Sequence, residues 1–453
     1  MNLQSPAVAL AAALRDGRLC PVELLEATLA AIEAQNPALN AVVTLDPTAR
    51  DQALAAREAL RRGEGGPLCG LPVGIKDVTP VAGVRTTYGC PLFTDHVPDT
   101  DGPVVARLRA AGAVIVGKTN TPELACGGHT NNPVFGPTRN PWNTDLSPGG
   151  STGGGAAALA SGLIALAEGT DMGGSLRIPA AFCGVVGLRP SPGLVPTGPL
   201  LGDDLQVSGP MGRTVADVAL MLDAIAGDPL PRGRPLGGRA FREVVDIGIS
   251  EDLRVGWCPD LSGRGVDPSL VAVAEDALAR LGVEVIEVDP GLQDDHDTFA
   301  VLRGLWMVEQ HLPLLDRLEL LGPDVAGNIR YGLGLRPEAV ARARRARRRM
   351  MRSVTRLFEQ VDVLATPTVA VPPFPVDSGP PTHIGNTPMR SHIDWVAPTY
   401  LVSLLALPAL SVPCGLDRRG LPVGLQLVGP RDGEARVLQV GAAVEAVANV
   451  GLP

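Results

Sequence analysis

Two Gly-Gly-Ser turns, one ending in Ser151 and the other in Ser175, are the part of this sequence best suited to chemistry. They lie within residues 148–190, and a run of small residues between them favours a helix. Glycine permits positive φ angles and lets the backbone approach a ligand closely. The polar Asp171 and Arg177 flank the second turn in apolar surroundings, which a glycine-rich linker would not require. Serine hydroxyls placed in this way indicate nucleophilic chemistry, provided that a base lies beside them.

The scarcity of lysine suggests which residue is the base. The sequence has 39 lysine and arginine residues, and only Lys76 and Lys118 are lysines. Arginine stays protonated in proteins, whereas a buried lysine can lose its proton near neutral pH and act as a base. Lys76 is flanked by the apolar Val73, Ile75 and Val78, and desolvation in such surroundings lowers the pKa of a lysine. Lys118, in the stretch VGKTN, is the competing candidate.

The first serine turn has two other interpretations. A phosphate-binding loop needs Gly-Lys-Ser/Thr at the start of a helix, but alanines follow Gly155 here. Residues 149–153 also match the GxSxG nucleophile elbow of α/β-hydrolases, which would make Ser151 the nucleophile of an esterase. That elbow follows a buried strand, whereas the preceding PWNTDLSP predicts a loop, so this interpretation ranks well behind. Four histidines could nominally complete such a triad: His296, His311, His383 and His392.

The rest of the sequence predicts the α/β layers that would position these turns. Helices are expected over residues 1–65, with Asn36-Pro37 ending the second one. Over residues 66–200, short apolar runs alternate with turns rich in Gly, Pro and Thr, as in buried strands joined by functional loops. The stretches RVGWCPD and VEVIEVD are predicted to be parallel strands joined by a helix. LPALSVPCG and LPVGLQLVG are predicted to form a final strand pair.

The composition disfavours several classes of function. A formal net charge of −9 would repel nucleic acid and anionic membranes, and the one basic run, at 341–352, is interpreted as the solvated face of a helix. The seven cysteines form no CxxC pair, so neither disulfides nor a metal site is expected. No apolar run is long enough for a membrane span, and the N-terminus lacks the basic region of a signal peptide. We therefore expect a cytoplasmic protein without a cofactor.

The residues around Ser175 resemble the amidase signature family. In that family a GGSS-type turn and a small-residue helix precede a D-x-GGS-x-R-x-P-A-x-x-x-G stretch, matched here by Asp171, Gly173, Gly174, Ser175, Arg177, Pro179, Ala180 and Gly184. The resemblance extends upstream through LPVGIKD and GKTNTPEL and downstream to LPALSVPCG and GLPVGLQLVG. It implies one domain over 1–453, built on a large twisted mixed β-sheet with helices on both faces.

The resemblance also implies a hydrolase of amide-like C–N bonds. By position, Ser175 is the nucleophile, Ser151 is the bridging serine, often in a cis peptide, and Lys76 is the terminal base. Such activation is needed because an amide carbon is a poor electrophile. The expected oxyanion hole consists of the backbone N–H groups of Met172, Gly173, Gly174 and Ser175.

Further residues are expected to support this site or to contact the substrate. Asp171 and Arg177 brace the second turn by a charge-assisted bond, and Thr152 offers a hydroxyl next to the bridging serine. The acyl side of the substrate is lined, by resemblance, by Cys126, Gly127, Gly128 and His129, and residues 300–400 cover it. A lone histidine such as His129 is nevertheless more often simply hydrogen-bonded. The apolar candidates for substrate contact are Met172, Trp306, Trp395 and Tyr400.

The sequence departs from the family pattern at several positions. Thr152 and Gly155 stand where family members usually carry serine, and Met172 replaces a common threonine. Ser403 and Ala406 replace the frequent Asn-x-x-Gly before LPAL. Gly155 removes a hydroxyl, which puts a secondary hydrogen bond in question. The triad is unaffected by these changes.

Three functions are compared on this basis. The first is a stand-alone amidase, a monomer or homodimer, acting on aryl or alkyl amides, anilides, carbamates (urethanes) or esters. The second is the glutaminase subunit of a tRNA-dependent amidotransferase, which shares the triad but needs partner subunits. Net acidity and the altered Asn-x-x-Gly disfavour it mildly. A non-catalytic binding protein would have lost a triad member, and none is missing. The apolar candidates favour amides and carbamates over free glutamine.

Overall fold

The computed structural model describes residues 2–196, 204–227, 239–292 and 296–453. The end of the predicted catalytic core segment, residues 197–200, lies outside these ranges. Within them, one mixed sheet has eleven strands in the order β1-β3-β2-β4-β6-β5-β12-β13-β9-β7-β8. The strands are β1 (Val42–Leu45), β2 (Pro72–Lys76), β3 (Val114–Thr119), β4 (Leu166–Asp171), β5 (Val186–Arg189), β6 (Val207–Gly212), β7 (Arg254–Trp257), β8 (Glu284–Glu287), β9 (Val363–Pro367), β12 (Ala409–Leu416) and β13 (Pro422–Val428).

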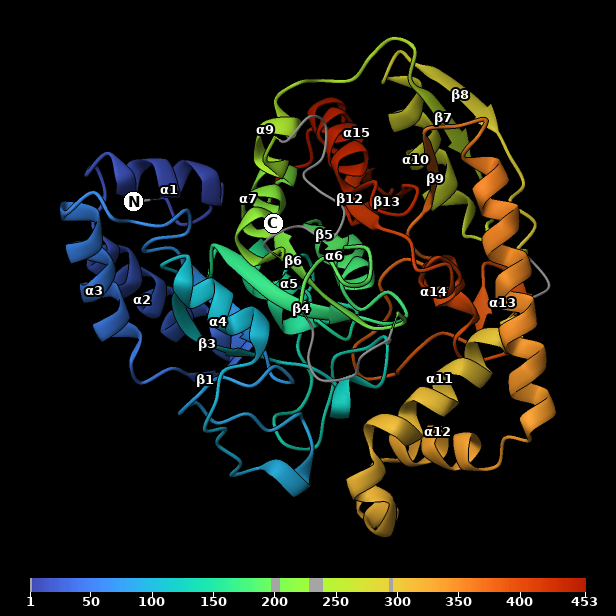
Figure 1. Ribbon diagram of the computed structural model, residues 1–453, viewed down its shortest axis with the longest axis horizontal. Coiled ribbons are helices and arrows are strands. Elements are labelled where there is room, and N and C mark those ends of the chain that lie inside the picture. The colour runs from blue at the N-terminus through green and yellow to red at the C-terminus, as the bar shows by residue number, and fades with distance from the viewer. Residues whose placement is uncertain (1, 197–203, 228–238, 293–295) are drawn as a thin grey trace.

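Helices cover both faces of this sheet (Figure 1). One face packs against α1 (Ala7–Arg15), α4 (Pro103–Ala110), α7 (Val215–Ile225), α9 (Phe241–Val245), α10 (Pro268–Ala279) and α15 (Glu434–Ala448). The other face packs against α2 (Pro21–Leu39), α3 (Ala49–Arg61), α5 (Gly153–Ala160) and α6 (Arg177–Cys183), and farther along the sheet against α11 (His296–Gln310), α13 (Pro337–Leu357) and α14 (Ala397–Leu404). The predicted fold class is therefore confirmed.

Shorter elements complete the chain. Helix α12 (Pro323–Leu333) packs against α11. The 3₁₀ helices are η1 (Pro91–Phe93), η2 (Glu123–Ala125), η3 (Leu312–Leu320) and η4 (Asp394–Val396). The segment 368–391, within the region expected to cover the substrate, contains a small antiparallel pair, β10 (His383–Ile384) and β11 (Thr387–Pro388). It also docks beside the first serine turn, because Ser147 N–H donates to the Phe374 carbonyl at 2.8 Å.

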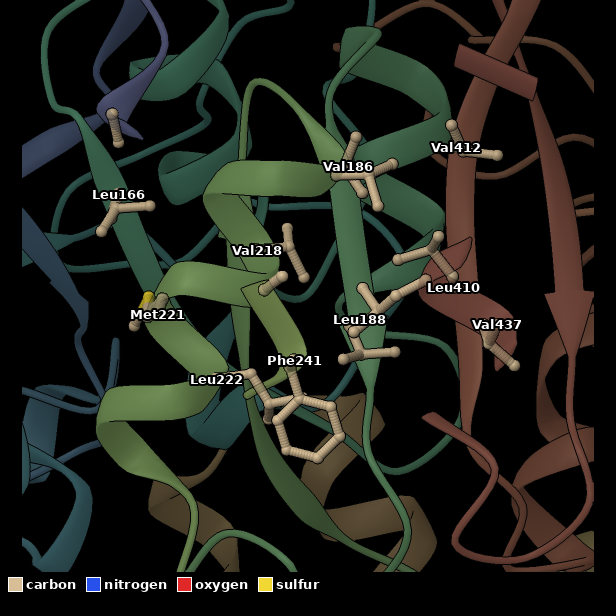
Figure 2. Packing of buried hydrophobic residues seen from close by; sticks show 14 of the residues in the cluster. Leu166, Val186, Leu188, Val218, Met221, Leu222, Phe241, Leu410, Val412 and Val437 are labelled. Atoms are coloured by element: carbon tan, nitrogen blue, oxygen red, sulfur yellow. The ribbon is translucent and has the colours of Figure 1, made fainter. Parts of the chain in front are cut away.

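Alternation along the strands divides the core between the two faces. In β3, Ile115 belongs to the cluster under α4 and α7, whereas Val114 and Val116 belong to the cluster under α2, α3 and α5. Figure 2 shows the first cluster, in which Leu166, Val186 and Leu188 from the strands meet Val218, Met221 and Leu222 of α7 and Phe241 of α9. The same alternation decides on which face each polar strand residue emerges.

Several predicted elements are confirmed. Strands β7 and β8 are parallel and joined through α10, and β12 and β13 form an antiparallel pair. The basic run lies on α13, whose buried positions are Ala343, Ala346, Met350, Val354 and Leu357. No helix in the described ranges is both long and apolar enough to cross a bilayer.

One predicted helix end is wrong. Helix α2 does not stop at Asn36-Pro37 but continues to Leu39, with Pro37 in its last turn. The helix is closed by Asn40, which adopts a left-handed φ of 51° and donates its N–H to the Asn36 carbonyl at 2.7 Å. So close to the end of a helix, proline removes only one hydrogen bond, and the Asn40 cap satisfies a final carbonyl instead.

Candidate active site

The first serine turn is held tightly between two layers. Gly149 has φ 76°, and the peptide bond between Gly150 and Ser151 is cis. A Cβ on Gly150 would lie 2.9 Å from the His129 backbone nitrogen, so only glycine fits there. The Thr130 hydroxyl donates to the Gly149 carbonyl at 2.8 Å. Residues 148–150 are a loop, not a strand, which removes the support for an α/β-hydrolase elbow at Ser151.

Lys76, at the end of β2, lies next to this turn. Its Nζ is hydrogen-bonded to Ser151 Oγ at 2.6 Å and to Thr170 Oγ1 at 2.9 Å. The side chain is fully buried. Burial lowers the pKa of Lys76 to about 7, although the carboxylates of Glu168 and Asp171 oppose the shift. A substantial fraction of Lys76 is therefore unprotonated at neutral pH and able to accept a proton.

The second turn joins the end of β4 to the start of α6. Gly174 has φ 117°, a conformation that favours glycine. The two turns are linked directly, because Thr152 N–H donates to the Ser175 carbonyl at 3.1 Å. Ser175 is half-buried, and it lines the same cavity as Ser151 and Thr170. Its hydroxyl makes no hydrogen bond to another described residue, which leaves Ser175 Oγ open toward the cavity.

A buried ionic cluster braces this turn, as predicted for Asp171 and Arg177. Arg177 binds the two carboxylate oxygens of Asp171 at 2.7 and 3.0 Å. Arg189 adds a bond to the Asp171 carbonyl at 2.5 Å. Burial alone would raise the pKa of Asp171, but the two guanidinium groups hold it well below its usual range. Arg177 also donates to the Ser403 hydroxyl at 2.7 Å, so the substituted Ser403 position still contributes an acceptor.

The same carboxylate restricts the predicted oxyanion hole. Asp171 accepts hydrogen bonds from Gly174 N–H at 3.0 Å and from Leu176 N–H at 3.1 Å. The Gly174 donor is therefore already engaged. Of the four predicted donors, Met172, Gly173 and Ser175 have no acceptor for their N–H groups among the described residues.

Lys118 has a different environment from Lys76. Its Nζ donates to the Thr79 carbonyl and to Thr86 Oγ1, the latter at 3.1 Å, and lies 4.0 Å from Asp77. Burial lowers the pKa of Lys118 to about 8, opposed mainly by Asp77. Lys118 has no contact with either serine turn.

Two polar residues of β4, Thr170 and Glu168, were not identified from the sequence. Thr170 contacts the Lys76 amine, and Glu168 accepts a bond from Thr79 at 3.0 Å and from the Lys76 backbone N–H at 3.3 Å. Burial raises the pKa of Glu168. The available signal was a carboxylate within the otherwise apolar run LIALAEGT, which in a buried strand indicates a charged partner.

The catalytic cavity in front of the serines has a volume of about 110 Å³. It is lined by Leu124, Ala125, Cys126, Gly127, Gly128, Ser151, Thr170, Met172, Gly173, Ser175, Ile178, Gln206, Phe299, Arg303, Trp306, Met307, Ile393 and Val396. A second cavity of about 600 Å³ adjoins it and shares Leu124, Ala125, Thr170, Gln206 and Trp306 with it. Apolar side chains dominate its lining, among them Val78, Tyr88, Phe93 and Leu314.

The predicted substrate-binding residues divide into two groups. Cys126, Gly127 and Gly128 line the catalytic cavity, as do Met172 and Trp306. Three others lie behind its wall: His129 has its Nδ1 bonded to Ser147 Oγ at 2.7 Å, Trp395 stacks on Phe182, and Tyr400 stacks on Phe299. His129 is thus the ordinary hydrogen-bonded histidine that its type suggests. His296 binds Tyr400 and the Ser262 carbonyl rather than a catalytic serine.

The departures at Gly155 and Ala406 leave structural traces. Thr152 Oγ1 and Thr119 Oγ1 are buried and have no hydrogen-bond partner among the described residues. A Cβ on Gly155 would lie 3.2 Å from Thr152 Cγ2 and 3.6 Å from Thr119 Oγ1. A serine at position 155 would thus place its hydroxyl beside Thr152 and Thr119, the two threonines whose hydroxyls lack a partner. Ala406 keeps the left-handed backbone suited to glycine, with φ 55°.

The described residues contain no group of three or more His, Cys, Asp or Glu side chains arranged to hold a metal ion. All seven cysteines are free thiols.

Comparison with known proteins agrees with this geometry. The model of the Amidase family matches residues 23–314 and 323–438. An acylamidase of Rhodococcus erythropolis is 38% identical over 97% of this chain and 95% of its own length. A glutamyl-tRNA(Gln) amidotransferase subunit of Roseiflexus sp. (strain RS-1) is also 38% identical, over 96% of this chain and 94% of its own.

Solved structures show the same architecture. A bacterial aryl acylamidase of the amidase signature family superposes with a TM-score of 0.89 at 27% identity, covering 98% of this chain and 96% of that one. A peptide amidase from Stenotrophomonas maltophilia gives a TM-score of 0.80 at 30% identity, over 99% and 98% of the two chains. The chain belongs to the amidase family. It is therefore an amidase signature hydrolase of amide C–N bonds.

Proposed function

We propose that this chain is a stand-alone amidase that cleaves short-chain acyl amides through a serine acyl-enzyme. Ser175 is the nucleophile, Ser151 relays its proton, and Lys76 is the base. The observation that carries the proposal is the 2.6 Å contact between Lys76 Nζ and Ser151 Oγ, together with the lowering of the Lys76 pKa to about 7 by burial. A base whose pKa lies near the working pH is effective because it is unprotonated often enough to accept a proton and acidic enough to return it.

The proton path follows from this arrangement. As Ser175 Oγ attacks the carbonyl carbon, its proton passes to Ser151 Oγ while the Ser151 proton passes to Lys76 Nζ. The negative charge on the former carbonyl oxygen is stabilised by the N–H groups of Met172, Gly173 and Ser175. When the C–N bond breaks, the proton returns by the same route to the departing nitrogen. Water then attacks the acyl-enzyme and releases the carboxylic acid.

Two cavities of unequal size suggest which part of the substrate lies where. The proton returns to the leaving amine near Thr170, which contacts Lys76 Nζ and lines both cavities. The amine portion therefore extends into the larger, apolar cavity, and the acyl portion occupies the smaller one. A cavity of about 150 Å³ accommodates benzene, so 110 Å³ suits a short acyl chain. An apolar leaving group favours anilides and other aryl amides, and carbamates and esters of similar shape would use the same chemistry.

Because the chain is also similar to an amidotransferase subunit, the experiment also tests the second function, that of a glutaminase subunit. The purified chain is assayed alone with acetanilide-type anilides, primary amides, carbamates, esters and glutamine. We expect turnover of short-chain anilides and its loss in Ser175→Ala. If glutamine were the one substrate hydrolysed, and if its hydrolysis required added amidotransferase subunits, the chain would be assigned to the second function. Full activity in Ser175→Ala would overturn the mechanism.

A further inference from the structure

Arg303 of α11 is the cationic side chain among the residues lining the catalytic cavity. Its Nε is buried and has no hydrogen-bond partner in the described part of the chain, and the guanidinium forms no ion pair with any carboxylate of the described residues. It lies over the Phe299 ring, whose centroid is 5.4 Å from the guanidinium carbon. Arg303 thus faces the site with donors that these residues leave unused.

Arg177 of the same site provides a contrast. Both are arginines of the same site, but Arg177 donates to Asp171, Thr399, Gln426 and Ser403. A guanidinium has five N–H donors in a fixed planar fork, suited to two parallel bonds with a carboxylate. The protein satisfies that fork at Arg177, whereas the described residues leave it unsatisfied at Arg303.

The surroundings of Arg303 make an anionic ligand favourable. Apolar residues make up much of the same cavity's lining, among them Met172, Met307, Ile393 and Val396. Burial lowers the pKa of Arg303, and the charges of nearby groups, including Asp324, oppose that shift. Asp324 acts from a distance, since it forms no ion pair with Arg303. A charge-assisted bond is strengthened in such low-dielectric surroundings.

We propose that Arg303 binds a carboxylate at the far end of the acyl group, so that the preferred substrates are monoamides of short dicarboxylic acids. This inference rests on the proposed function and names the substrate class of the same site. Arg303 lines the smaller cavity, which holds the acyl portion, and is absent from the lining of the larger one. The small volume limits the chain between the two carbonyl carbons to a few methylenes.

The test compares two anilides of equal shape, the monoanilide of succinic acid and neutral 4-methylpentananilide. For the wild type we expect kcat/KM to favour the carboxylate by roughly 10- to 100-fold, mainly through KM, the range expected of a charge-assisted bidentate bond. Arg303→Met should bring this ratio to about one or below, and Arg303→Lys should restore part of it because a point charge remains. The exposed Arg345 of α13 supplies the control, since Arg345→Met should keep the wild-type ratio.

The inference is overturned if the wild type cleaves the neutral anilide as well as the charged one, or if Arg303→Met lowers both equally. If the wild type cleaves neither anilide, the proposed function fails instead. The inference is then tested by calorimetric titration of the succinic monoanilide into Ser175→Ala and into Ser175→Ala/Arg303→Met. Binding that is weakened at least tenfold in the double variant supports it, and equal binding overturns it.

Discussion

Lys76 and Lys118 stand on neighbouring parallel strands in nearly identical apolar runs, yet the structure gives them different surroundings. The register pairs Lys76 with Thr119 and Lys118 with Ile75, so the two side chains emerge on opposite faces of the sheet. Lys76 emerges on the face of α5 and meets Ser151. Lys118 emerges on the other face and meets the loop at 79–86.

The difference teaches that burial alone does not make a lysine a base. Burial lowers the pKa of both, to about 7 for Lys76 and about 8 for Lys118. What separates them is the chemistry of their partners. Both hydrogen-bond partners of the Lys76 amine are hydroxyls, one of them on Ser151 in the first serine turn, and these can exchange protons with it. Lys118 contacts one hydroxyl, that of Thr86, but a backbone carbonyl and the Asp77 carboxylate hold it as a donor.

The largest effect is expected at the proposed base. Lys76→Met removes the proton acceptor while keeping the length and apolar character of the side chain. We expect kcat/KM for a short-chain anilide to fall by a factor on the order of 10⁴ to 10⁶, as for loss of a triad member in serine hydrolases. Steady-state kinetics measure it. Activity within tenfold of the wild type would show that the comparison assigns the wrong lysine.

Lys118→Met should act on stability instead. It leaves the buried Asp77 carboxylate and the Thr79 carbonyl without their cation, and removal of one buried ionic partner costs about 3 kcal/mol. Urea denaturation should show this loss, while kcat should change far less than in Lys76→Met. An inactive yet fully stable Lys118→Met protein would reverse the two assignments.

The smallest effect is a shift of the pH profile. Because the pKa of Lys76 is about 7, kcat/KM should decline as the pH falls through this value and Lys76 becomes protonated. The Glu168 carboxylate raises the Lys76 pKa, so Glu168→Gln should move this acidic limb to lower pH. A limb that stays in place or moves upward would mean that another group titrates.

The features that short sequence motifs encode could be predicted from the sequence. The family was expected from the motif around Ser175, and the mixed sheet with helices on both faces was what that resemblance implied; both are confirmed. The two lysines were the candidate bases from the start. The missed residues depend on register. Thr170 and Glu168 matter because β4 lies beside β2, and no local pattern states which strands are neighbours.

The same limit explains the outcome for the substrate contacts. His129 was grouped with Cys126 because the resemblance implied that the loop carrying both lines the acyl side, but the loop turns His129 toward Ser147. Arg303 lines the cavity, although its helical stretch shows only the ordinary mixture of apolar and charged residues. Which face of α11 meets the serines is decided by its packing against α13 and α14, far away in the chain.

The burial of both lysines also has a practical consequence. Both are fully inaccessible to solvent in the folded protein, and the chain has no other lysine. Amine-directed dyes and cross-linkers therefore find no lysine to modify until β2 or β3 separates from its neighbours. Time-dependent acylation at these two positions, followed by mass spectrometry, would serve as a built-in reporter of unfolding, with each amine recording exposure of its own face of the sheet.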